Sequence, residues 1–166
     1  MVEQYVVFKS HDQFFALPVL LVTRVVETDQ FISLPDVPDF VLGVFEYQKH
    51  MIPIIDLRRK LFAEFTPTTD ATKVILCDWQ GQHLGLFIEN IVGINYLEET
   101  NYEEELSQAD LKRGYIGKFL KFKDQVVISL KLDYLFDNNQ SQSLSDSVAK
   151  LEKVEEDADD TPTTTD

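Results

Sequence analysis

Hydrophobic residues occur along this chain in short runs that are separated by polar residues, glycine or proline. Most runs are rich in valine, isoleucine and phenylalanine, which favour β-strands. We expect strands over 4–10, 13–19, 24–29, 41–47, 50–57, 72–79, 82–90, 91–97, 114–122 and 125–132. Helical spacing is confined to brief turns at 17–22, 56–62 and 130–136. The pattern therefore predicts an all-β protein with short helical turns.

Two pairs of these runs are separated by only two residues. Gln48 and Lys49 divide one pair, and Gln80 and Gly81 divide the other, so each pair predicts a β-hairpin. The segment 62–72 is polar and contains proline. Because half of the expected strands precede it and half follow it, we expect a break here between two small barrels.

The folded domain is expected to span residues 1–139. Beyond it, 140–166 is acidic and holds too few apolar residues to offset the entropy of ordering, which predicts a largely disordered tail. Apolar residues within 143–156 recur at spacings of three and four. An amphipathic helix and a weakly helical tail therefore both stay open.

The chain is strongly acidic, with 29 acidic and 15 basic side chains and a formal net charge of -14. Binding to nucleic acid requires the opposite charge, so DNA and RNA are excluded as expected partners. The first residues lack the basic and apolar regions of a signal peptide, and no window is long enough to span a membrane. We expect a cytoplasmic protein without membrane insertion.

Residue types that carry out catalysis or bind metals are scattered. The three histidines, His11, His50 and His83, form no metal-binding motif. Cys77 lies in an expected strand, which favours a buried, inert thiol. Cys77 and His83 can meet across their hairpin, where cross-strand packing explains them better than catalysis. The acidic segment 97–110 reads as a solvated loop, so we expect no catalytic residue, metal site or cofactor.

The segment 51–62, MIPIIDLRRKLF, joins a stiff apolar run to a basic turn. Pro53 has no N–H to donate, so we expect it at an edge or a bulge of its strand. Asp56 is placed to cap the turn that follows. Arg58 and Arg59 fall near the end of that turn, where structural pairing with carboxylates is favoured over contact with a partner.

Residues 26–61 resemble the CheW-like domain, the coupling-protein fold of bacterial chemotaxis. The family's core motif runs from a Leu-Pro pair through Gly-Val and an Asn-Leu-Arg-Gly hairpin to Pro-Val-Ile-Asp-Leu-Arg. The matching positions here are Pro35, Phe40, Gly43, Val44, Pro53, Asp56, Leu57 and Arg58. Residues 73–94 and 114–136 resemble the second half of the domain, so the resemblance covers residues 4–136.

This resemblance implies two intertwined five-stranded SH3-like β-barrels without catalytic activity. It implies an adaptor that couples a CheA-type histidine kinase to the cytoplasmic tip of a chemoreceptor, in chemotaxis or type IV pilus motility. The kinase's regulatory domain would dock barrel to barrel, with apolar residues in 41–45 and 52–55 as candidates. The receptor's helical hairpin would lie in a groove between the barrels. The alternative is a standalone regulatory module that binds a small ligand between its barrels or a different partner protein.

The chain departs from the family at the hairpin, where Glu-Tyr-Gln-Lys at 46–49 replaces Asn-Leu-Arg-Gly. The arginine associated with coupling is therefore absent, which puts receptor binding in question. Arg24 also replaces a family glutamate. We predict either a charge-reversed pair between Arg24 and Glu46 or two solvated side chains. The candidate partner-binding residues are Arg24, Glu46, Tyr47, Gln48, Lys49 and Arg58.

Overall fold

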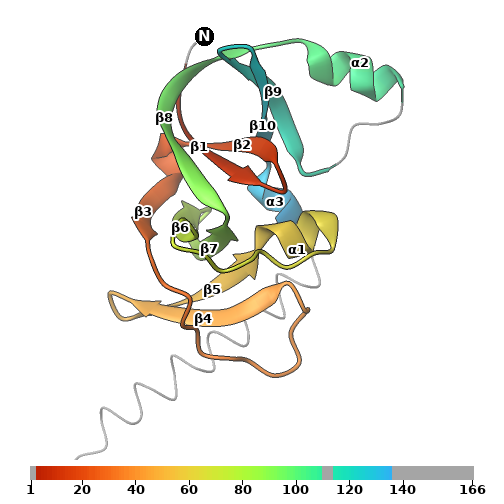
Figure 1. The fold of residues 1–166 in the computed structure, drawn as a ribbon. Coiled ribbons are helices and arrows are strands. Elements are labelled where there is room, and N and C mark those ends of the chain that lie inside the picture. Colours follow the sequence, from red (N-terminus) through yellow and green to blue (C-terminus); the bar gives the residue numbers. More distant parts are fainter. Residues whose placement is uncertain (1–2, 110–113, 136–166) are drawn as a thin grey trace, which may run out of the picture.

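The structure, a computed structural model, describes residues 3–109 and 114–135, which form ten strands in two sheets (Figure 1). The strands are β1 (Glu3–Ser10), β2 (Gln13–Pro18), β3 (Val22–Val26), β4 (Val41–Tyr47), β5 (His50–Asp56), β6 (Lys73–Trp79), β7 (Gln82–Ile88), β8 (Asn90–Glu99), β9 (Ile116–Phe122) and β10 (Gln125–Leu130). The helices are η1, a 3-10 helix (Val19–Leu21), α1 (Leu57–Phe62), α2 (Tyr102–Gln108) and α3 (Leu132–Leu135). The all-β prediction is confirmed. The expected tail at 140–166 and the helix within it lie outside the described residues.

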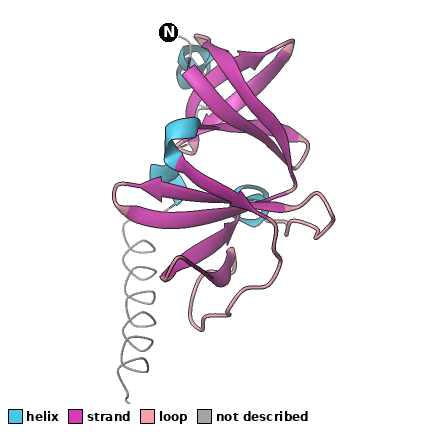
Figure 2. Ribbon diagram, turned by 90° about the vertical axis from the view of Figure 1, so that its left-hand side faces the viewer, coloured by secondary structure: helices cyan, strands magenta, loops and turns pink. Residues whose placement is uncertain are grey.

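The two sheets are intertwined in sequence. The order β1-β2-β10-β9-β8 makes a closed barrel, and β3-β6-β7-β5-β4 makes a second five-stranded sheet (Figures 1 and 2). The chain leaves the barrel after β2, builds the whole second sheet and returns with β8. The segment 62–72 therefore joins β5 to β6 inside the second sheet, unlike the break between barrels expected there.

Strands buried on both faces explain why the hydrophobic runs are nearly continuous. On β1, Tyr5 and Val7 belong to a small cluster that draws only on strands of the barrel. Val6 and Phe8 point the other way, into a large core shared by strands of both sheets. A third cluster, which includes Ile54, draws only on the second sheet. The shared core thus holds the barrel and the second sheet together.

The second sheet is nearly closed by a seam between β4 and the segment that follows β3. Ile32 and Val44 exchange two backbone hydrogen bonds of 2.9 and 2.8 Å there. Gly43 makes this approach possible, because a Cβ at this position would lie 2.2 Å from the Ile32 carbonyl oxygen. Its φ of +139° is also one that other residues rarely adopt.

Pro53 sits differently from the expectation, since β5 is an interior strand between β7 and β4. Its pairing with β7 begins only at Ile54, one residue after the proline. Opposite Pro53 on β4, Val44 turns its backbone groups towards Ile32. Neither neighbouring strand therefore needs an N–H from Pro53.

The expected turns at 17–22, 56–62 and 130–136 form η1, α1 and α3. The solvated loop expected at 97–110 is wrong, because β8 extends to Glu99 and α2 follows it. Leu97 is buried inside the barrel, and Leu106 packs against the shared core. Burial of these two leucines orders the segment, although its acidic composition predicts a solvated loop.

Among the described residues, no helix has the length and apolar character needed to cross a membrane. The same residues contain no group of three or more side chains placed to hold a metal ion.

Candidate partner-binding surfaces

Four of the candidate residues lie at 46–49, in the hairpin that joins β4 to β5. Tyr47 pairs with His50 across the turn, which confirms the predicted hairpin. Gln48 and Lys49 form its exposed tip, with φ angles of 50° and 67°. This conformation costs about 1–2 kcal/mol for each residue other than glycine. The hairpin thus keeps its two-residue turn without the glycine of the family motif.

Arg24, on β3, reaches this hairpin through a different residue from the one predicted. Its Nη1 donates a hydrogen bond of 3.4 Å to the Tyr47 hydroxyl. Among the described residues, no ion pair joins Arg24 to Glu46, so the charge-reversed pair is wrong. Arg24 lies opposite Leu76, and Leu76 and Tyr47 belong to the same cluster on the inner face of the sheet. Glu46, one residue before Tyr47, points to the other face.

Cys77 and His83, at the neighbouring β6–β7 hairpin, do not form a reactive pair. Cys77 lies opposite Leu84, whereas His83 lies opposite Asp78. The His83 ring faces His50 instead, with 4.7 Å between ring centroids. Burial raises the pKa of the Cys77 thiol to about 12. The thiol is therefore protonated at neutral pH and is no nucleophile, as the sequence predicted.

Arg58, the sixth candidate, lies apart from the hairpin and ties the two sheets together. It donates to Glu64 at 2.7 Å and to Glu89 at 3.3 Å. His11, in the β1–β2 turn, also donates its backbone N–H to Glu89 and stacks on Phe62 with 4.3 Å between ring centroids. The hydrogen bond from Arg58 lowers the pKa of Glu64. The guanidinium of Arg58 therefore pairs with two carboxylates of the same chain, as expected for a structural role.

Arg59 also pairs within the chain, as predicted for this turn. Its guanidinium donates to Asp39 at 2.5 Å and to the carbonyl oxygen of Ala63 at 2.5 Å. The same group lies 4.8 Å from the centroid of the Phe65 ring. The hydrogen bond to Asp39 lowers the pKa of that carboxyl. Arg59 therefore stabilises the C-terminal end of α1, where a cation is favourable.

The apolar docking surface expected in 41–45 and 52–55 is largely core. Val44 and Ile54 are completely buried, and Val41 and Ile52 are buried too. Leu42 and Phe45 are only partly exposed. These segments therefore cannot offer the contiguous apolar patch that docking requires.

An exposed apolar stripe lies instead on β8, made by Val92, Ile94 and Tyr96. The three side chains are 38%, 57% and 69% exposed. They alternate with Gly93 and Asn95, which lie opposite the inward-facing residues of β1. A strand normally turns its apolar face inwards, but the middle of β8, residues 92–96, turns its apolar side chains outwards. The sequence carried this signal as apolar residues alternating with glycine and asparagine, but a period of two does not reveal which face is buried.

The β8 stripe also borders a free strand edge. β8 pairs with β1 along most of its length, but with β9 only at Glu98 and Glu99. Within the part of the chain that the structure describes, the residues of the stripe therefore pair with β1 alone, and the barrel closes only through the short β8–β9 pairing at its end. We call this surface, Val92, Ile94 and Tyr96 with their free edge, the β8 surface. Exposed apolar side chains beside unpaired backbone are typical of a protein-binding site.

Comparison with known proteins agrees with this architecture. Residues 4–140 match the model of the CheW-like domain. The chain belongs to this family, whose fold has two SH3-like subdomains. A solved structure titled the scaffolding protein TtCheW, from Thermoanaerobacter tengcongensis, superimposes with a TM-score of 0.69 at 22% identity, covering 84% of this chain and 91% of that one.

Two relatives show how proteins of this family are named. The Chemotaxis protein CheW of Helicobacter pylori is 26% identical over 133 residues, which are 78% of this chain and 79% of that protein. Protein PilI of Pseudomonas aeruginosa is 25% identical over 124 residues, 74% of this chain and 70% of that protein. Both similarities extend over most of the domain.

Proposed function

We propose that this protein is a non-catalytic coupling adaptor of chemotaxis or type IV pilus signalling. In this role it connects a CheA-type histidine kinase to the cytoplasmic tip of a chemoreceptor in the cytoplasm. The observation that carries the proposal is the match to the CheW-like domain over residues 4–140, together with the relatives named Chemotaxis protein CheW and Protein PilI.

The β8 surface is the proposed contact with the helical partner. A receptor helix would present an apolar face. The protein that binds such a helix needs exposed aliphatic and aromatic side chains to receive it. Ile94 and Tyr96 provide the two most exposed anchors of this surface. Buried aromatic anchors contribute most of the binding energy in many interfaces. Loss of Tyr96 should therefore weaken binding more than loss of any charge at the rim.

The altered hairpin is the proposed determinant of which partner is accepted. Where the family motif has an arginine, this chain has Gln48, and Glu46 and Lys49 change the charge pattern around it. Charges at the rim of an interface select among partners more than they add affinity. We therefore expect this adaptor to recognise a receptor whose charges differ from those of receptors used by adaptors with the usual motif.

Isothermal titration calorimetry with two purified partners from the same organism tests the proposal. The partners are the regulatory domain of its CheA-type kinase and the cytoplasmic tip of its receptor. We expect both to bind, and Tyr96→Asp to lose the receptor tip. Tyr102→Asp is the matched control, because Tyr102 is exposed on α2 and outside the β8 surface. Absence of binding to both partners would contradict the proposal.

A further inference from the structure

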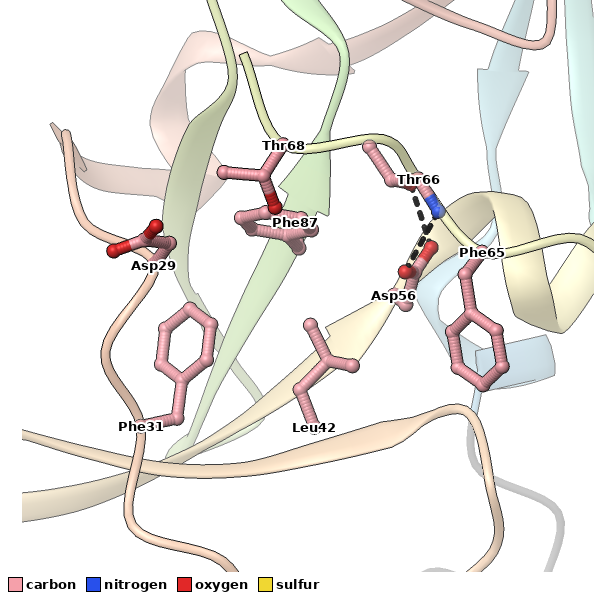
Figure 3. A pocket seen from close by; sticks show the side chains of 8 residues that line it. All are labelled: Asp29, Phe31, Leu42, Asp56, Phe65, Thr66, Thr68 and Phe87. Atoms are coloured by element: carbon pink, nitrogen blue, oxygen red, sulfur yellow. Dashed lines mark hydrogen bonds between the residues drawn. The ribbon is translucent and has the colours of Figure 1, made fainter. Parts of the chain in front are cut away.

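A cavity of about 270 Å³ opens in the second sheet and shares no residue with the β8 surface or the hairpin. Figure 3 shows its side chains, which come from β4, β5, β7, the segment after β3 and the segment after α1. The lining residues are Asp29, Phe31, Leu42, Asp56, Phe65, Thr66, Thr68 and Phe87. Half of these residues are aromatic or aliphatic and half are polar, and small-molecule sites commonly combine apolar walls with a few polar groups.

Hydrogen bonds fix one side of the cavity. The buried carboxylate of Asp56 accepts from the Thr66 N–H at 2.9 Å and from the Thr66 hydroxyl at 2.6 Å. The same carboxylate caps α1 by accepting from the Arg59 N–H at 3.1 Å. These bonds hold the segment after α1 against β5, and they place Phe65 at the cavity with 53% of its surface exposed.

The opposite side is held by the seam of the second sheet. Phe31 directly precedes Ile32, whose two backbone hydrogen bonds to Val44 fix this segment. The Phe31 ring then meets the buried Phe87 ring edge to face, with 5.8 Å between ring centroids. Aromatic walls are therefore present before any ligand binds, which lowers the entropy cost of binding.

The charges around the cavity are unbalanced. Asp29 and Asp56 are the two charged residues among those that line it. Both oxygens of Asp56 already accept hydrogen bonds, whereas Asp29 is exposed and accepts from the side chain of Gln30. The Arg59 guanidinium, which lies 4.8 Å from the centroid of the Phe65 ring, is paired with Asp39. One carboxylate is thus available to a ligand.

We propose that this cavity binds a small organic cation, a primary amine or guanidine on a short apolar stem. The faces of phenylalanine rings attract cations, and the Asp29 carboxylate supplies the counter-charge at the rim. The net charge of -14 also concentrates cations near the protein. The volume is below the range of drug-sized sites, so a stem of about four to six carbon atoms fits.

Titration followed by ¹H–¹⁵N correlation spectra tests this site with n-butylamine as the probe. 1-Butanol and sodium butyrate are the matched neutral and anionic controls, at constant pH and ionic strength. We expect saturable shifts of the amides of 29–31, 65, 66 and 68 with butylamine, at about millimolar affinity. Butanol should bind more weakly and butyrate should not bind. Equal binding of amine and alcohol, or no saturable shift, would overturn the proposal.

Two substitutions separate charge recognition from mere filling of the cavity. Asp29→Asn should weaken butylamine about three- to fivefold and leave butanol unchanged, because it removes one exposed ion pair. Asp36→Asn is the control, since Asp36 is an exposed acid of the same connection that does not line the cavity. Phe65→Ala should weaken amine and alcohol together. Unchanged amine affinity in Asp29→Asn would refute the role of Asp29.

A competition experiment identifies the source of the cation. If the kinase regulatory domain displaces butylamine, the natural cation is a lysine or arginine side chain of that partner. If butylamine and the partner bind together, the natural ligand is a free amine. The inference does not rest on the adaptor function, because the first titration needs only this protein.

Discussion

Gly43→Ala tests how the second sheet is closed. The added methyl group would lie 2.2 Å from the Ile32 carbonyl oxygen and 2.9 Å from its carbonyl carbon. Ordinary carbon–oxygen contacts are well beyond 3 Å, so the two segments must separate. Separation breaks both backbone hydrogen bonds between Ile32 and Val44. The substitution should therefore open the seam while the rest of the sheet keeps its pairing.

The expected loss of stability follows from two contributions. Two backbone hydrogen bonds contribute about 0.5–1.5 kcal/mol each. Holding an alanine at the φ of Gly43, +139°, costs about another 1–3 kcal/mol. We therefore expect the free energy of unfolding to fall by about 2–6 kcal/mol, measured by urea denaturation with circular dichroism.

Gly81→Ala is the matched control for this experiment. Gly81 also has a positive φ, of 78°, but a Cβ there would meet nothing within 4 Å. Only the conformational cost applies, so the expected loss is about 1 kcal/mol. Amide hydrogen exchange at Ile32 and Val44 should quicken in Gly43→Ala alone. Equal destabilisation by the two substitutions, with unchanged exchange at the seam, would refute this account of the closure.

Three further predictions concern buried or paired polar groups. Asp56→Ala should lower the free energy of unfolding by about 3 kcal/mol in urea denaturation, because it removes a helix cap and leaves Thr66 donors unsatisfied. The pKa of Glu64 lies below its ordinary value of 4.5 through its bond to Arg58. That stabilisation is present above pH 4.5 and is lost as the pH falls through the lowered pKa, so the stability difference between the wild type and Arg58→Met should shrink in acid. Cys77, with its pKa near 12, should react with a thiol reagent at pH 8 only when the protein unfolds.

Local patterns in the sequence predicted the elements of this fold well. Each hydrophobic run formed a strand, because valine-, isoleucine- and phenylalanine-rich runs between polar breaks have few other ways to bury their side chains. The cap at Asp56 and the two-residue hairpins also follow from neighbouring residues. These features depend on interactions over a few residues, which a sequence displays directly.

The pairing of strands that are far apart in the sequence could not be predicted in the same way. Nothing in the sequence of β8, β9 and β10 marks them as partners of β1 and β2, so the sequence alone predicts the border between the sheets at 62–72. The Arg24–Glu46 pair failed for a related reason. Residues two apart on a strand point to the same face, but this rule does not extend from Glu46 to Gln48, because the chain turns at Gln48, which has a φ of 50°. Arg24 donates instead to Tyr47, and β3 and β4 stand at opposite ends of the strand order, so local sequence does not show that these two residues meet.

The central claim is that this protein couples a kinase to a receptor, and kinase activity measures it most directly. Purified CheA-type kinase and receptor-containing membranes from the same organism would be combined with wild-type protein, Tyr96→Asp or Tyr102→Asp. Autophosphorylation of the kinase is expected to rise several-fold with the wild type and with Tyr102→Asp, and to stay at the level of kinase alone with Tyr96→Asp. A kinase whose activity is the same with and without the wild-type protein would contradict the account.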